Sequence, residues 1–386
     1  MKINHFLLMI FLMGCALFVV GQLYVPISLN SNISTQFNVT ASESMLVSSV
    51  FGLSYAAGFL VLGSLSDKYG RRTVLVSGLS ILALMTFVIS LSSSFTFLLI
   101  ARAFQGFVAS SFPPAALSLV SETLECNKRP LGISLISLSF LASAPVIQLL
   151  STWLDINFCK VMLLLVPIYL VGALGIFSFA PKTLSNLKKE KFVLRTQFFL
   201  LLKDSNILVS WFVATTVLFS FVAFHSGMQS LGKNLNVNLQ YLRFAGLPTL
   251  LFVFWASSLI RKFGAFKTTL IGLVITILAF VIGLFNNSLN LLIASAVLTA
   301  GVSITTPSLI ASISGRSSMQ NRGLSLAIYS FMLFFGASVA PISSQYFAQF
   351  GLVILNIVPI SYILIGFIII YMAKKSDYKK ISYHEA

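Results

Sequence analysis

One arginine, Arg102, lies inside the apolar stretch FTFLLIARAFQGFVASSFPPAALSLV, which runs from residue 95 to 120. A charged side chain near the middle of a bilayer is costly, so such a residue either reaches outward to the interface or is retained for a function. Gln105 follows three residues later and shares its helical face, and Gly106 and Ala109 allow another helix to pack closely beside them. We predict that Arg102 and Gln105 line an internal cavity.

Several other polar side chains fall inside apolar stretches and are further candidates for a substrate or coupling site. A histidine among them titrates near neutral pH when unperturbed, and packing at a helix end is the alternative explanation for its position. For the glutamines and tyrosines the alternative is an ordinary interhelical hydrogen bond. The candidates are Gln22, Tyr24, Gln148, His225, Gln229 and Tyr329.

The 9 acidic residues all fall outside the middle of the apolar stretches. A carboxylate inside a cavity can exchange a proton for a cationic solute, because burial raises its pKa. A cavity that holds an arginine and no carboxylate should instead favour anionic or neutral solutes. The three cysteines, Cys15, Cys126 and Cys159, have no metal-type spacing, and no nucleophile–base pair lies in these stretches. We therefore predict no metal, no cofactor and no enzyme activity.

The composition indicates a membrane protein. Of the 386 residues, 57% are hydrophobic and only 9% are charged, against roughly 25% charged in a soluble domain. Runs of about 20 apolar residues predict twelve membrane-spanning helices. A basic break over 181–205 separates an N-terminal half, 1–180, from a C-terminal half, 206–386. The predicted spans are 6–27, 45–65, 73–92, 96–119, 131–152, 159–180, 206–229, 240–260, 268–286, 290–312, 323–346 and 351–373.

The basic residues predict the orientation of these spans. With both termini in the cytoplasm, all but four of the 25 lysines and arginines fall in cytoplasmic segments, as the positive-inside rule requires. The four exceptions are Arg102, Lys160, Lys233 and Arg243. The net charge of +16 is thus a topology signal, strengthened by anionic lipid headgroups, and it does not indicate a nucleic-acid partner. We expect a multi-pass protein of the cell membrane, in bacteria the inner membrane.

The two halves carry traces of a common origin. The segment GSLSDKYGRRTVL (63–75) after the second span aligns with SSLIRKFGAFKTT (257–269) after the eighth, at an offset of 194 residues. ASAPVIQ (142–148) in the fifth span likewise resembles ASVAPIS (337–343) in the eleventh. These matches predict two pseudo-symmetric six-helix halves, as in many secondary transporters.

The loop after the second span has a recognisable pattern. Gly63 permits close helix packing, Gly70 permits a tight turn, and Asp67 at a helix end can pair with a base or with the N-terminus of another helix. A simple stop-transfer cluster would explain only the bases. The full pattern resembles the signature loop of the major facilitator superfamily, and it is filled by Gly63, Leu65, Ser66, Asp67, Lys68, Gly70, Arg71 and Arg72.

The stretch around Arg102 adds to this resemblance. Leu98, Arg102, Gln105, Gly106, Val108, Ala109 and Ser110 look like the fourth-helix motif common in proton-linked drug exporters of the same superfamily, where this arginine is associated with proton coupling or substrate contact. The fifth-helix exporter motif is only partly matched. Ala144 and Pro145 stand where Gly-Pro is expected, and Gln148 and Leu149 stand where glycines would follow.

The resemblance implies a specific set of expectations. The fold would be an all-α integral membrane protein that works by alternating access, its two halves rocking about a site near mid-membrane. The function would be proton-coupled export of a small organic drug or metabolite, including anions such as a siderophore or an organic acid. An importer or facilitative carrier is the alternative within transport, and a non-transporting receptor or scaffold is the alternative of another class. The expected partners are a small-molecule substrate, protons and membrane lipids, and the expected state is a monomer.

Overall fold

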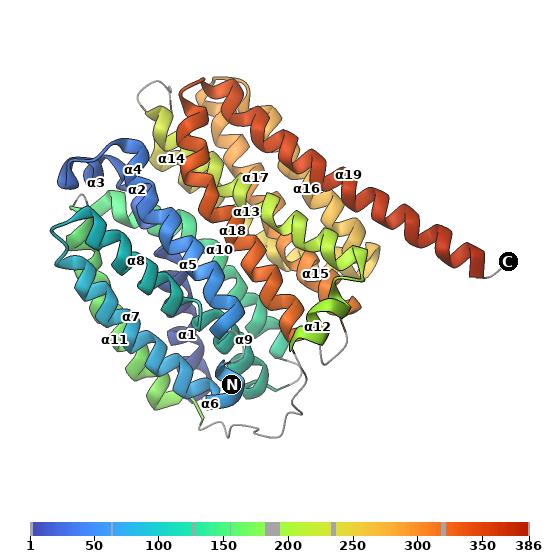
Figure 1. Ribbon diagram of the computed structural model, residues 1–386, viewed down its shortest axis with the longest axis horizontal. Helices are drawn as coiled ribbons and strands as arrows, with labels where there is room; N and C mark the ends of the chain where they lie inside the picture. Colours follow the sequence, from blue (N-terminus) through green and yellow to red (C-terminus); the bar gives the residue numbers. More distant parts are fainter. Residues whose placement is uncertain are drawn as a thin grey trace. The chain divides into compact units, whose positions relative to one another are not determined.

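The computed structural model describes residues 3–62, 65–125, 128–154, 156–181, 194–232, 237–317 and 322–384. All regular structure within these ranges is helical (Figure 1). Eleven helices in the described ranges are long and apolar enough to cross a membrane, and the shorter helix His5–Gly21 is also apolar. The predicted all-α membrane fold is therefore confirmed. The chain divides into two compact units, Met1–Lys189 and Glu190–Ala386, which are described separately.

The first unit is built around five helix pairings. Helix α1 packs on α10 and α11, α7 packs on α11, and α8 packs on α5 and α7. The helices of this unit are α1 (Ile3–Gly21), α2 (Val25–Ser28), α3 (Asn30–Phe37), α4 (Ala41–Ser44), α5 (Leu46–Leu62), α6 (Leu65–Tyr69), α7 (Arg71–Ser90), α8 (Phe95–Ala109), α9 (Phe112–Thr123), α10 (Arg129–Leu154) and α11 (Phe158–Phe179).

Glycines bring α5 and α8 into close contact in this unit (Figure 1). A Cβ added at Gly106 would lie 2.2 Å from the carbonyl oxygen of Phe51, and one added at Gly58 would lie 2.8 Å from that of Phe107. Both distances are too short for any side chain. The two backbones therefore touch, which holds α8, and Arg102 with it, against α5.

The second unit repeats the pairings of the first. Helix α13 packs on α18 and α19, α16 packs on α17 and α19, and α14 and α15 pack on α17. Its helices are α12 (Leu194–Leu201), α13 (Ser205–Leu231), α14 (Leu239–Gly246), the 3-10 helix η2 (Pro248–Leu251), α15 (Phe252–Phe263), α16 (Ala265–Gly283), α17 (Ser288–Arg316), α18 (Arg322–Ala348) and α19 (Leu352–His384).

The aligned glycines of the two signature segments have the same conformation. Gly70 has φ 88° and ψ 144° and precedes α7, and Gly264 has φ 79° and ψ 156° and precedes α16. A positive φ in this range is accessible to glycine and strained for other residues. The sequence offset of 194 residues therefore corresponds to a repeated turn.

Prolines interrupt three of the predicted spans. The span expected over 6–27 leaves the helix after Gly21, the one expected over 96–119 breaks between Ala109 and Phe112, and the one expected over 240–260 passes through η2. Pro26, Pro113 and Pro248 lie at the first or second position of the helix that follows each break. A proline has no N–H to donate to the preceding turn, so each helix must restart there.

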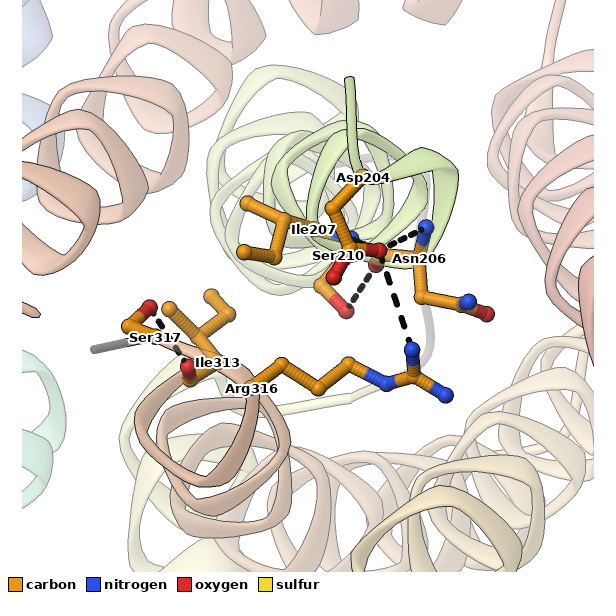
Figure 2. A network of polar contacts seen from close by, with 7 residues as sticks. All are labelled: Asp204, Asn206, Ile207, Ser210, Ile313, Arg316 and Ser317. Carbon is orange, nitrogen blue, oxygen red and sulfur yellow. Dashed lines mark hydrogen bonds and ion pairs between the residues drawn. The ribbon is translucent and has the colours of Figure 1, made fainter. Parts of the chain in front are cut away.

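A small polar network fixes one end of the second unit. Figure 2 shows Asp204 at the N-terminus of α13, where its carboxylate accepts hydrogen bonds from the backbone N–H groups of Asn206 and Ile207, at 2.9 and 3.4 Å. The same carboxylate lies 3.7 Å from the guanidinium of Arg316 in the last turn of α17. Asp204 thus caps one helix and pairs with the end of another.

The predicted linker 181–205 lies only partly within the described residues. Its residues 182–193 are outside them, and the rest includes α12.

Candidate functional site

Arg102 lies at the centre of a buried polar network in the first unit. Its side chain is fully buried, and its guanidinium stacks over the ring of Phe51, with the central carbon 4.3 Å from the ring centroid. Nε donates to the carbonyl oxygen of Val47 at 3.1 Å, and Nη2 donates to that of Gln22 at 2.8 Å. Nη1 donates to the side-chain oxygens of Gln22 at 3.1 Å and Gln105 at 2.6 Å. Four of the five guanidinium N–H groups are thus used.

The break after α1 provides one of these acceptors. In a continuous helix the carbonyl of Gln22 would accept from the N–H of residue 26, but residue 26 is a proline and has none. The chain instead turns through Gln22 to Tyr24, where Tyr24 N donates to Gly21 O at 2.8 Å. The carbonyl left over is the one to which Arg102 donates. The proline and the arginine therefore form one local arrangement.

The two glutamines extend the network in opposite directions. Gln22 donates to the hydroxyl of Tyr169 on α11 at 2.7 Å, and that hydroxyl donates to the carbonyl of Phe18 at 3.0 Å. Gln105 donates to the hydroxyl of Thr86 on α7 at 2.7 Å. The network therefore joins α1, α5, α7, α8 and α11 through one guanidinium.

All four acceptors of Arg102 are neutral oxygens. The unit thus holds a positive charge in its interior by dipoles and a ring face, without a carboxylate among these partners. Chemically, such a group can restrain helices, donate its remaining N–H, and attract negative charge. The structure rules out the outward-reaching arrangement, because the side chain is buried rather than at an interface.

The remaining candidates of the first unit are also buried. Tyr24 directly precedes α2. Gln148 lies on α10, in the segment that carries the partly matched exporter motif. Hydrogen bonds thus bring together three of the predicted residues in this unit, Gln22, Arg102 and Gln105.

The second unit holds its own candidates. His225 is buried on α13, and its Nδ1 lies 3.1 Å from the carbonyl oxygen of Phe221, so Nδ1 carries the hydrogen and Nε2 is the basic nitrogen. Gln229, one turn later on α13, accepts a hydrogen bond of 2.7 Å from Arg243 on α14. Tyr329 on α18 is buried, with its hydroxyl 3.4 Å from the carbonyl oxygen of Thr306.

Arg243 is a second buried arginine that the sequence-based candidates did not include. It falls inside the predicted span 240–260, and the structure buries it within α14, in the same apolar segment as α15. The available signal was its position inside the apolar stretch LQYLRFAGLPTLL (239–251), where it is the only charged residue. Arg102 is therefore one of two buried arginines in the described part of the chain.

The signature loop is described in part. Gly63 and the side chain of Asp67 lie outside the described residues. Arg71 pairs with Glu122 at the end of α9, at 3.1 Å, and also donates to the hydroxyl of Ser66 at 3.1 Å.

The second arginine of the signature loop makes a separate connection. Arg72 donates to the carbonyl of Phe177 on α11 at 2.5 Å and stacks on the ring of that residue. Together with Gly70 at the turn, the two arginines tie α7 to α9 and α11. Sequence reasoning identified these bases but not the partners Glu122 and Phe177.

Comparisons with known proteins agree on one family. The chain matches the model of the Major Facilitator Superfamily over residues 6–247 and 229–385. An uncharacterized transporter of Buchnera aphidicola subsp. Schizaphis graminum (strain Sg) is 33% identical over 126 residues, which are 33% of this chain and 30% of that protein. Multidrug resistance protein D of Escherichia coli (strain K12) is 30% identical over 148 residues, 37% of each protein. The matched part of the chain thus spans 30% and 37% of the length of these relatives.

Proposed function

The chain belongs to the Major Facilitator Superfamily, and from that premise we propose that it is a secondary active transporter that exports a small organic molecule by alternating access. Export is supported by the fourth-helix motif around Arg102 and by the similarity to Multidrug resistance protein D. We propose protons as the coupling ion and the cell membrane as the location, with both termini in the cytoplasm.

One observation supports the proposed class of substrate. Among the residues whose side chains the structure describes, Arg102 and Arg243 are buried and no aspartate or glutamate is. A cationic solute entering such an interior would meet like charge at low dielectric constant, where repulsion is strong. The preferred solutes are therefore anionic or neutral, a class that includes organic acids and carboxylate siderophores.

The hydrogen bonds of Arg102 refine this proposal. Four of its N–H groups are already hydrogen-bonded. An anion would therefore be attracted by the positive charge of the guanidinium, but without rearrangement it could accept at most one hydrogen bond from it. A solute with a single negative charge, or a neutral solute with an acceptor, matches that capacity. A multiply charged anion would require the network to open.

The coupling proton needs a group other than a buried carboxylate. We assign this role to His225, whose Nε2 can accept a proton while Nδ1 remains bonded to the carbonyl of Phe221. Protonation would add a positive charge one turn from Gln229, and it would change the electrostatic environment of Arg243, which donates a hydrogen bond to Gln229. Tyr24, Gln148 and Tyr329 are proposed as polar residues that contact the solute.

Transport by the purified protein in proteoliposomes tests this function. With an acidic lumen, a proton antiporter should concentrate salicylate, an anion, and chloramphenicol, a neutral solute, in the lumen, and it should leave the cation ethidium outside. A protonophore should abolish the accumulation. Passive distribution of a weak acid would run the other way, because the acid collects on the alkaline side.

Other outcomes would redirect or remove the proposal. Accumulation of ethidium would contradict the substrate class. Equilibration without accumulation would indicate a facilitative carrier. Accumulation of the neutral chloramphenicol only under the opposite gradient would indicate a proton-coupled importer.

A further inference from the structure

An apolar cavity lies within the first unit, between α2, α10 and α11. Its volume is about 190 Å³, and its walls include Val25 of α2, Leu150 and Leu154 of α10, and Leu164 and Ile168 of α11. Every residue that lines it is aliphatic except Ser151. Sites for whole small molecules usually have about 300–1,000 Å³. This cavity is therefore suited to an alkyl chain rather than to the transported solute.

The cavity reaches the outer surface of α11. Leu164, one of its walls, is 49% exposed, and so is its neighbour Leu163, which does not line the cavity. Exposed leucines on a membrane-spanning helix face the acyl chains of the bilayer. An acyl chain can therefore enter the cavity from the side.

One end of the cavity carries the features of a membrane interface. Leu154 belongs to the last turn of α10 and Val161 to the first turns of α11, so the cavity ends at the connection between these helices. Next to them are Trp153, which is 77% exposed, and Lys160, which is also exposed. Tryptophan is enriched at the level of lipid headgroups, and lysine attracts their phosphates.

Lys160 is otherwise unexplained. It is one of the few basic residues outside the segments expected in the cytoplasm, so orientation in the membrane does not account for it. Within the described part of the chain, its ammonium group has no ion-pair partner. A cation in this position is complementary to an anionic headgroup whose chain occupies the cavity.

We propose that the α2–α10–α11 cavity binds one acyl chain of an anionic phospholipid, with Lys160 holding the phosphate at the end of the α10–α11 connection. This lipid site is separate from the Arg102 network and does not depend on the direction or substrate of transport. Its occupancy would fill the space between α10 and α11 beside the break after α1.

Quenching of Trp153 fluorescence by lipids with brominated acyl chains tests the proposal. The full chain carries Trp255→Phe, because Trp255 is 66% exposed and would also be quenched, whereas Trp211 is only 3% exposed and adds a constant background. Brominated phosphatidylglycerol and brominated phosphatidylcholine are compared in otherwise identical vesicles. One lysine near a membrane surface is worth about 1 kcal/mol, so half-maximal quenching should need about fivefold less of the anionic lipid.

Two variants with matched controls distinguish binding of the lipid headgroup from binding of the acyl chain. Lys160→Gln should remove the preference for phosphatidylglycerol, while Lys262→Gln, an exposed lysine of the second unit, should keep it. Leu164→Phe should fill the cavity and weaken quenching by both lipids, while Leu163→Phe should leave both unchanged. Elution as a single species from size-exclusion chromatography confirms folding of each variant. Equal quenching by the two lipids, a preference that survives Lys160→Gln, or identical behaviour of the two leucine variants would overturn the proposal.

Discussion

At the scale of the residue, Arg102 shows how one cation can be kept inside a membrane protein. Neutral carbonyl and amide oxygens take up four of its N–H groups, and an aromatic face covers it. The side chain therefore serves as a connector of helices as well as a source of positive potential. Any functional role in transport acts through this connection.

Loss of the connector should be measurable as loss of stability. Arg102→Ala leaves buried acceptors without a donor and opens a cavity, at about 1–3 kcal/mol for an unsatisfied buried group with a further cost for the lost packing. Arg102→Lys should fall between alanine and the unchanged protein, because it keeps the charge without the planar fork. Thermal unfolding in detergent measures both. Arg261→Ala, at an exposed helix end, is the control and should change stability by less than about 0.5 kcal/mol. Equal unfolding of Arg102→Ala and the unchanged protein would remove the connector role.

At the scale of the element, the break after α1 explains why the arginine is needed there. Pro26 withholds the N–H that would have satisfied the carbonyl of Gln22, and Arg102 on another helix replaces it. Sequence reasoning counted Pro26 as part of an apolar run and missed the break. The partners Thr86 and Tyr169 were missed too, because each is a single polar residue in an apolar run and carries no charge to mark it.

This compensation predicts energetic coupling between two helices. Pro26→Ala supplies an N–H at residue 26, so Arg102→Ala should cost less in that background, by about 1 kcal/mol or more. A double-mutant cycle from unfolding measurements gives the difference. Pro145→Ala, at a proline inside the continuous helix α10, is the control and should be additive with Arg102→Ala. Additivity in both pairs would show that the proline and the arginine act independently.

The contact between α5 and α8 makes a second prediction at this scale. Gly106→Ala would place a Cβ 2.2 Å from the carbonyl oxygen of Phe51, and a backbone atom cannot move aside as a side chain could. The helices must separate, at about 1–3 kcal/mol for overpacking. Gly14→Ala is the matched control in α1, because no atom lies within 4 Å of its added Cβ, and it should gain up to about 1 kcal/mol in helix propensity. Similar thermal stability of the two variants would contradict the close contact.

At the scale of the whole molecule, the sequence was most informative where the membrane imposes a uniform rule. Spans follow from length and apolarity, since a backbone in lipid must satisfy its own hydrogen bonds. The repeated turn followed from the alignment of Gly70 with Gly264, and both have a positive φ. The burial of Arg243 could not be predicted from its place in the span 240–260, because it depends on the packing of α14 against α17.

The orientation of the spans is the remaining property of the whole molecule that the sequence predicts. The two ends of α16 provide a matched pair, because Lys262 lies just before it and Asn286 just after it, and both are exposed. In a background in which Cys15, Cys126 and Cys159 are replaced by serine, each position is changed to cysteine in turn. The positive-inside rule places Lys262 in the cytoplasm. A membrane-impermeant maleimide added to intact cells should therefore label the Asn286→Cys protein and reach the Lys262→Cys protein only after the membrane is opened. The reverse pattern would invert the topology, and with it the assignment of the signature loop to the cytoplasmic side and of Lys160 to the outer one.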